Sequence, residues 1–143
     1  MGGIPASIDN LTSLYEQGVR AIVTLTEHPL TALKAFEGDV IAAQGFDMLH
    51  VPIVDQDPPT REQVQEVLDF LKRMKGEGKP VYLHCHAGIG RTGTMLHAVY
   101  LLSGMDLTST QQKIKAARPA NQFFMLTTTQ KTFLEALAVE LAR

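Results

Sequence analysis

The feature that most constrains the fold of this chain is a set of three short β-rich runs, each separated from the next by helical patterns. The runs span residues 19–25, 46–53 and 81–84 and are rich in apolar and β-branched side chains. Strands that alternate with helices favour βαβ units, in which helices cover a mostly parallel sheet. Sheets of this kind place their ligand sites at the carboxyl ends of the strands. The residues that directly follow each run are therefore the candidates for a ligand site.

Helix signals occupy the intervals between these runs. Thr60 and Gln63 form a capping box ahead of an apolar helical stripe, which stops in the breaker-rich segment 76–80. Further helices are expected over residues 9–17, 92–102 and 107–117, and from about Thr127 along an apolar stripe that reaches Leu141. A chain of 143 residues normally makes one domain, so we expect a single domain over residues 1–143.

Composition narrows the classes of function. The single cysteine, Cys85, cannot form an internal disulfide or a thiolate zinc cluster, so a reducing compartment, the cytoplasm, is the expected location. A formal net charge of −2 without a run of Lys or Arg disfavours a nucleic-acid or anionic-membrane surface. No apolar run approaches the roughly 20 residues that span a bilayer. We expect a monomer that binds neither nucleic acid nor membrane.

The third β-rich run leads into an unusual loop, with the sequence HCHAGIGRTG over residues 84–93. Gly88 and Gly90 permit backbone angles that let the loop curl into a ring. Inward-facing N–H groups of such a ring bind anions, and the positive end of the helix that follows adds to the same point. Arg91 can hold two oxygens of a tetrahedral anion with its planar guanidinium group. The expected phosphate-binding residues are His86, Ala87, Gly88, Ile89, Gly90 and Arg91.

Cys85 lies at the base of this predicted ring, where the helix end and Arg91 favour its thiolate form. A thiolate that faces a bound phosphorus atom is a nucleophile for phosphoryl transfer. The ring amides and Arg91 would stabilise the charge of the transition state, and the Thr92 hydroxyl would stabilise the thiolate as it leaves. The alternative is that Cys85 is a small buried hydrophobic residue, a role that needs neither the glycines nor the arginine.

The loop resembles the signature of the protein-tyrosine-phosphatase superfamily, which is His-Cys, five residues, then Arg and Ser or Thr. His84, Cys85, Arg91 and Thr92 fill these positions. Residues 18–27 and the pair Arg118-Pro119 are similar to small atypical dual-specificity phosphatases, so the resemblance covers nearly the whole chain. It implies an α/β domain with a short, mostly parallel central sheet of about four strands flanked by helices. It also implies a cysteinyl-phosphate intermediate, no cofactor, and a supporting role for His84 through a hydrogen bond to backbone.

The implied mechanism needs a general acid to protonate the leaving oxygen. Related phosphatases carry this acid as Asp, two residues, then Pro-Pro, and Asp55 matches that spacing in the loop 54–59. Asp57 is the alternative acid, although its place before Pro58 suits a residue that shapes the loop. Gln130 lies in a region where several relatives carry a glutamine that positions the hydrolytic water. A solvated polar residue on a helix is an equally good interpretation of Gln130.

A metal site is the alternative raised by the two histidines beside the cysteine. Strand alternation would place His84 and His86 on the face opposite the thiol. The sequence offers no acidic residue or second cysteine at a metal-type spacing nearby, so we expect no metal.

The expected activity is hydrolysis of phosphotyrosine monoesters in a phosphorylated protein, with phosphoserine and phosphothreonine as a second option. Lipid phosphatases of this superfamily often carry Lys inside the signature loop, where this chain has His86 and Ile89. That difference disfavours inositol phosphates and lipids, and the net charge argues mildly against a nucleic-acid 5′-phosphate. A phosphopeptide-binding module without catalysis and a rhodanese-like sulfur transferase are the competing functions.

Overall fold

The computed structural model describes residues 3–33, 40–87 and 89–142 of the chain. Three parallel strands form its sheet in the order β2-β1-β3, with β1 at Ala21–Thr24, β2 at Asp47–His50 and β3 at Val81–His84. The register pairs Thr24 of β1 with His50 of β2 and with His84 of β3. The carboxyl ends of all three strands therefore meet at one edge of the sheet, and the predicted parallel α/β fold is confirmed.

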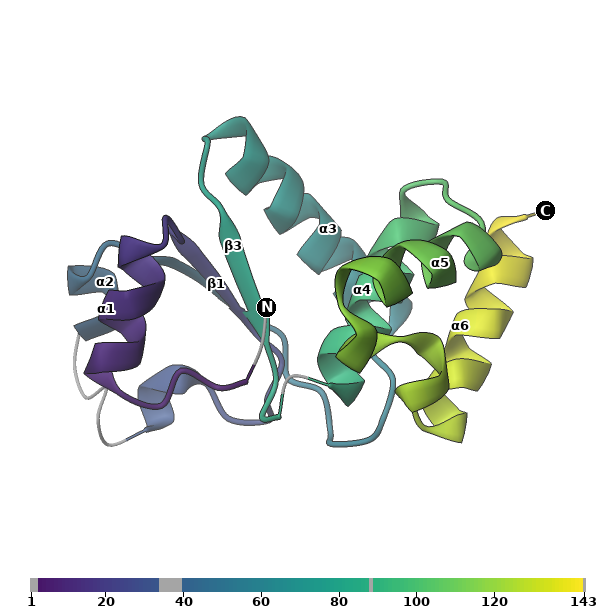
Figure 1. Cartoon of the computed structure of the whole chain (residues 1–143), viewed down its shortest axis with the longest axis horizontal. Helices are drawn as coiled ribbons and strands as arrows, with labels where there is room; N and C mark the ends of the chain where they lie inside the picture. The colour runs from purple at the N-terminus through teal and green to yellow at the C-terminus, as the bar shows by residue number, and fades with distance from the viewer. Residues whose placement is uncertain (1–2, 34–39, 88, 143) are drawn as a thin grey trace.

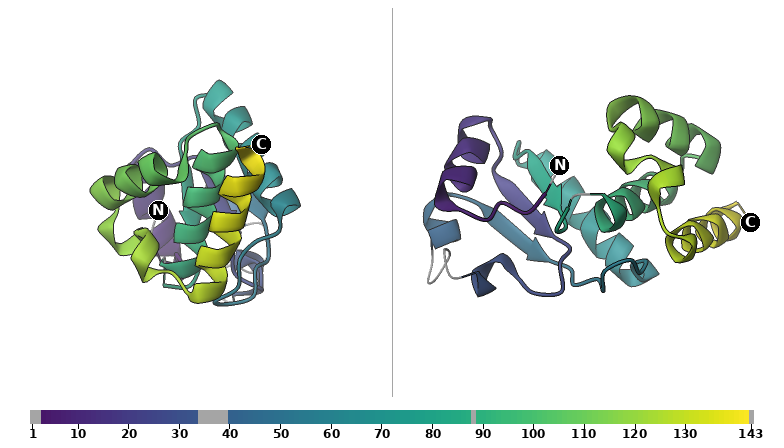
Figure 2. Two further views of the ribbon diagram at one scale, coloured as in Figure 1. Left: turned by 90° about the vertical axis from the view of Figure 1, so that its right-hand side faces the viewer. Right: turned by 60° about the horizontal axis from the view of Figure 1, so that its bottom comes forward.

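Helices cover both faces of this sheet (Figure 1). The helices α1 (Ile8–Glu16) and α2 (Val40–Ala43) lie on one side, and α3 (Arg61–Gly76) and α4 (Gly90–Leu102) lie on the other. Figure 2 shows α5 (Leu107–Ala117) and α6 (Thr128–Leu141) beside α4, at the end of the molecule away from α1. Short 3₁₀ turns complete the described chain at η1 (Leu30–Ala32), η3 (Pro119–Asn121) and η4 (Phe123–Met125). None of the helices in the described residues has the length and apolar character needed to cross a membrane.

The sheet has three strands in the described residues, one fewer than the four or so that the family resemblance implies. The N-terminal segment runs beside the loop after β3 and makes one backbone hydrogen bond there, from Ile4 N–H to the His86 carbonyl at 3.0 Å. The next residue, Pro5, has no N–H to extend a ladder, and Ser7 already caps α1. This segment therefore supports the sheet edge without becoming a strand.

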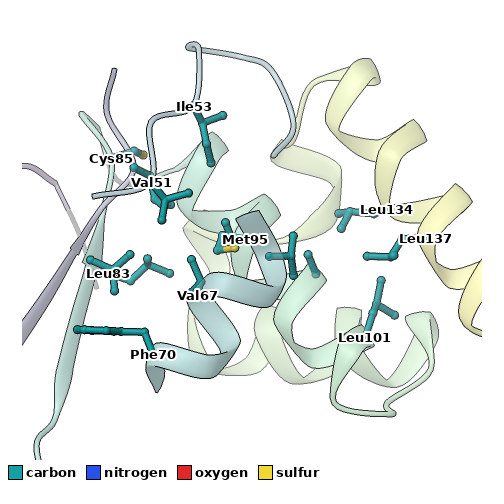
Figure 3. Packing of buried hydrophobic residues seen from close by; sticks show 14 of the residues in the cluster. Val51, Ile53, Val67, Phe70, Leu83, Cys85, Met95, Leu101, Leu134 and Leu137 are labelled. Atoms are coloured by element: carbon teal, nitrogen blue, oxygen red, sulfur yellow. The ribbon is translucent and has the colours of Figure 1, made fainter. Parts of the chain in front are cut away.

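Two clusters of buried side chains hold the layers together. Alternation along β1 sends Ile22 toward α1 and α2, where it packs with Leu11 and Phe46. Val23 points to the opposite face, into a larger cluster that runs from the sheet through α3 and α4 to α6. Figure 3 shows part of this larger cluster, including Leu83, Met95 and Leu134, with Cys85 at the end of β3. The candidate nucleophile therefore lies where the core meets the carboxyl edge of the sheet.

Candidate active site

Cys85 is the first residue after β3, and its side chain is only 3 % exposed. The hydroxyl of Thr92, in the first turn of α4, donates a hydrogen bond to Cys85 Sγ at 3.3 Å. The positive end of a helix dipole stabilises a nearby negative charge. The structure therefore brings the thiol, the predicted hydroxyl and the N-terminus of α4 together.

Arg91 joins this group to the loop that follows β2. Its side chain is buried, and Nη1 donates to the Ile53 carbonyl at 3.0 Å, while Nη2 lies 3.7 Å from Asp55 Oδ1. Within the described part of the chain, the buried Nε of Arg91 has no hydrogen-bond partner. A buried N–H without a partner costs free energy, and the edge formed by Nε and Nη2 suits two oxygens of an oxyanion. The arrangement fits the predicted anion-binding role.

The loop between Cys85 and α4 holds the remaining predicted phosphate-binding residues. His86 and Ala87 are exposed, Ile89 and Gly90 are half-buried, and Gly88 lies outside the described residues. The inward direction of the loop N–H groups stays a prediction. The residues that the structure describes contain no cluster of three or more His, Cys, Asp or Glu arranged to hold a metal ion.

Contacts from two distant segments anchor this loop. Ile4 N–H donates to the His86 carbonyl, and Asn121 Nδ2 donates to the Ile89 carbonyl at 2.9 Å. Arg118 Nε in turn donates to Asn121 Oδ1 at 2.6 Å. Arg118, which the sequence shows only as part of a point of resemblance, therefore helps to support the loop through Asn121. Asn121 carries no motif of its own, so sequence reasoning missed it.

His84 connects the strand end to the Cys85 backbone from inside the protein. Its Nδ1 lies 3.0 Å from the Cys85 carbonyl, and its Nε2 lies 2.9 Å from Thr24 Oγ1. A carbonyl only accepts, so Nδ1 carries the proton and Nε2 accepts from the Thr24 hydroxyl. Burial lowers the pKa of His84 to about 4, and the positive charge of Arg91 adds to this effect against the opposing hydrogen bond to Cys85. His84 is therefore neutral near pH 7.

Because His84 is buried and neutral, we expect the free energy of unfolding to depend on pH. In the unfolded chain His84 binds a proton below about pH 6.5, whereas in the folded protein it does so only below about pH 4. Unfolding takes up a proton between these values, so acid favours the unfolded state in that window. Over that range His84 should remove about 3 kcal/mol from the free energy of unfolding. Burial also lowers the pKa of His97, so protonation of His97 in the unfolded chain likewise lowers the free energy of unfolding as the pH falls.

Denaturant unfolding of the wild type and of His84→Gln, at pH values from 7 down to 4, measures this contribution. Glutamine cannot titrate, so the gap between the two proteins should shrink as the pH falls. A gap that stays constant across the range would contradict the assignment of a neutral, buried His84.

The loop after β2 presents its two candidate acids differently. The Asp55 carboxylate is mostly exposed and faces Arg91, and the Asp55 backbone N–H donates to Glu27 Oε1 at 3.4 Å. The hydrogen bonds of Asp57 are made by its backbone. Its N–H donates to the Val54 carbonyl, and its carbonyl accepts from Gln130 Nε2 at 3.4 Å. Of the two, the structure brings the Asp55 carboxylate to Arg91.

A pocket of about 320 Å³ opens beside Arg91. His86, one of the predicted phosphate-binding residues, lines the pocket. Glu27 and His28 also line it, although the sequence does not assign them to the site. Glu27 and His28 follow β1, so the rule that ligands bind beyond strand ends, applied to β1, could have found them. The other lining residues are Ile4, Thr26, Pro29, Ala32 and Leu33.

Gln130 is completely buried, so its interpretation as a solvated helix residue is wrong. Its Oε1 accepts from Thr127 N–H at 3.0 Å, as the second half of a capping box at the start of α6. Its Nε2 faces both the Asp57 carbonyl and Gly90, where an added Cβ would lie 3.2 Å from that nitrogen. Gln130 therefore lies between the loop after β2 and the start of α4. A role in positioning water stays a prediction.

A family model described as "Polymorphic toxin system, DSP-PTPase phosphatase" matches residues 1–105 of the chain. The chain belongs to this DSP-PTPase phosphatase family. The predicted resemblance to dual-specificity phosphatases is thereby confirmed.

Two curated relatives are informative. The chain is 27 % identical over 103 residues to human "Phosphatidylglycerophosphatase and protein-tyrosine phosphatase 1", a match that covers 71 % of this chain and 51 % of the relative. It is 29 % identical over 110 residues to rat "Dual specificity protein phosphatase 12", covering 76 % of this chain and 30 % of the relative. The chain therefore spans about half the length, or less, of these two relatives.

Solved structures share the fold over almost the whole chain. The active form of Tk-PTP matches with a TM-score of 0.79 and 29 % identity, covering 96 % of this chain and 88 % of that one. PTPMT1 matches with a TM-score of 0.80 and 21 % identity, covering 99 % of this chain and 90 % of the PTPMT1 chain. The fold is that of a small cysteine-based phosphatase.

Proposed function

We propose that this chain hydrolyses phosphotyrosine monoesters in phosphorylated proteins, and also accepts phosphoserine and phosphothreonine. The observation that carries the proposal is the hydrogen bond from Thr92 to the Cys85 thiol at the N-terminus of α4, with the buried Arg91 directly before Thr92 in the same helix turn. Phosphoryl transfer requires the oxyanion to lie beside the sulfur, and we assign Arg91 to hold it there.

The proposed reaction has two steps. In the first, the Cys85 thiolate attacks phosphorus, the bond from phosphorus to the leaving oxygen breaks, and Asp55 donates a proton to that oxygen. In the second, water attacks the cysteinyl phosphate, Asp55 takes a proton from the water, and the sulfur–phosphorus bond breaks. Thr92 donates a hydrogen bond to the departing thiolate, and inorganic phosphate is released.

The pocket beside Arg91 supports an aryl ester as substrate. Ile4, Pro29 and Leu33 give it apolar walls, which suit the ring of a tyrosine side chain. Glu27 lines the pocket, and the Asp55 carboxylate lies 3.7 Å from Arg91 Nη2; both negative charges would repel a headgroup that carries several phosphates.

A second candidate function is the hydrolysis of a lipid phosphomonoester, which the name of the human relative supports. Rates on a phosphotyrosyl peptide and on vesicles that contain phosphatidylglycerophosphate separate the two candidates. We expect kcat/KM to be higher for the peptide. A preference for the vesicles would replace the protein substrate with the lipid, and binding of either without turnover would leave a phosphoester-binding module.

The Asp55→Asn substitution is expected to lower kcat/KM for phenyl phosphate by about 10²-fold, because the leaving phenolate then departs without a proton. For a dinitrophenyl ester, which leaves without help, the loss should be much smaller. Asp57→Asn is the matched control and should retain wild-type rates, since Asp57 contacts its surroundings through the backbone. If Asp57→Asn rather than Asp55→Asn showed the selective loss, Asp57 would be the acid.

A further inference from the structure

The N-terminus of α6 is fastened to the loop that carries Asp55. Thr127 Oγ1 donates to the Gln56 carbonyl at 2.9 Å, and Gln130 Nε2 lies 3.4 Å from the Asp57 carbonyl. These carbonyls belong to the two residues that directly follow Asp55. Asp55 itself is held by Glu27, whose Oε1 accepts a hydrogen bond from the Asp55 backbone N–H at 3.4 Å. The loop is therefore held from α6 as well as from the segment after β1.

Gln56 has a backbone angle φ of +71°, in the left-handed region that residues other than glycine rarely adopt. Such a conformation persists only where the surrounding structure holds it. The carbonyl that accepts from Thr127 is that of Gln56 itself. The bond from α6 therefore acts at the strained residue next to Asp55.

The hydroxyl of Thr127 makes two bonds of different kinds. It accepts from Gln130 N–H at 3.2 Å, which caps α6, and it donates to Gln56, which fixes the loop. Because one oxygen does both, the hydroxyl hydrogen has one favourable direction. Substitutions at Thr127 can separate these two bonds.

From these contacts we propose that Thr127 is a positioning residue for the general acid: its hydroxyl holds Gln56 and so keeps the Asp55 carboxyl beside Arg91. The inference rests on the proposed function, because it takes Asp55 as the acid. A small displacement of a proton donor slows proton transfer and leaves the nucleophile unaffected. Loss of the Thr127 bond should therefore lower kcat/KM only for those substrates whose leaving group needs a proton.

Three variants at Thr127 and one control test this role. Thr127→Val removes both bonds, Thr127→Asp keeps a capping acceptor but cannot donate to Gln56 when ionised, and Thr127→Ser keeps both. Asp106→Ala is the matched control, because Asp106 caps α5 by accepting from Ser109 N–H at 2.7 Å. It removes a helix cap of the same kind at another helix.

The measurements are kcat/KM for phenyl phosphate and for dinitrophenyl phosphate, and the rate of Cys85 alkylation by iodoacetate. We expect Thr127→Val and Thr127→Asp to lose about tenfold on phenyl phosphate and less than about twofold on the dinitrophenyl ester, with alkylation unchanged. Thr127→Ser and Asp106→Ala should match the wild type on both esters. Equal losses on both esters, or no loss on phenyl phosphate, in an active enzyme would overturn the positioning role alone. A wild-type protein inactive on both esters would overturn the proposed function and the positioning role together.

Discussion

The Cys85→Ser variant is expected to lose phosphomonoesterase activity, with kcat lower by more than about 10³-fold. A serine hydroxyl is a far weaker nucleophile than a thiolate, and the site is built to stabilise negative charge on sulfur through Thr92 and the N-terminus of α4. Steady-state hydrolysis of an aryl phosphate measures the loss.

The control for Cys85→Ser is its ability to bind phosphate. Serine is close in size to cysteine, and Arg91 is unchanged, so inorganic phosphate should still raise the melting temperature of the variant. Loss of activity with retained phosphate stabilisation separates a missing nucleophile from a damaged site. Activity comparable to the wild type would remove Cys85 from the mechanism.

Replacing Arg91 with lysine is the second change with a large expected effect. Lysine keeps the positive charge but cannot present two parallel donors, and it cannot reproduce both the Nη1 bond to Ile53 and an anion-binding edge. We expect kcat/KM to fall by about 10²- to 10³-fold, the range that applies to a lost transition-state donor.

Arg61→Lys provides the matched control for this substitution. Arg61 is exposed on α3 and pairs with Glu140 on α6, so the same change there should leave kcat/KM within about twofold of the wild type. Phosphate should raise the melting temperature of Arg61→Lys as it does for the wild type, but that of Arg91→Lys only weakly. Equal activity of Arg91→Lys and the wild type would show that charge alone suffices at this position.

Local features of the chain could be predicted from the sequence because their physics is local. The capping box of Thr60 and Gln63 begins α3, and α5 occupies the predicted 107–117 before Pro119 ends it. The loop that begins at Cys85 follows a strand and precedes a helix, so its motif predicts both the nucleophile and the anion-binding arginine of the proposed mechanism. Short-range spacing is sufficient for all of these.

The supports of the site could not be predicted, because they join residues that are distant in the sequence. Thr24 meets His84 only through the β1–β3 register, and Thr127 meets Gln56 only because α6 packs on α4. Asn121 likewise reaches Ile89 across the chain. These pairs depend on tertiary packing, which no periodicity or motif in one sequence encodes visibly. The site residues themselves are therefore easier to find than the residues that hold them.

Phosphorylation of Cys85 during turnover is the central step of the proposed mechanism. Rapid mixing of the wild-type protein with an aryl phosphate, quenching within one turnover, and mass spectrometry of the resulting peptides test it most directly. We expect a phosphoryl group on the peptide that contains Cys85, and its absence from Cys85→Ser treated in the same way. Turnover by the wild type with the phosphoryl group on another residue, or on none, would contradict this mechanism.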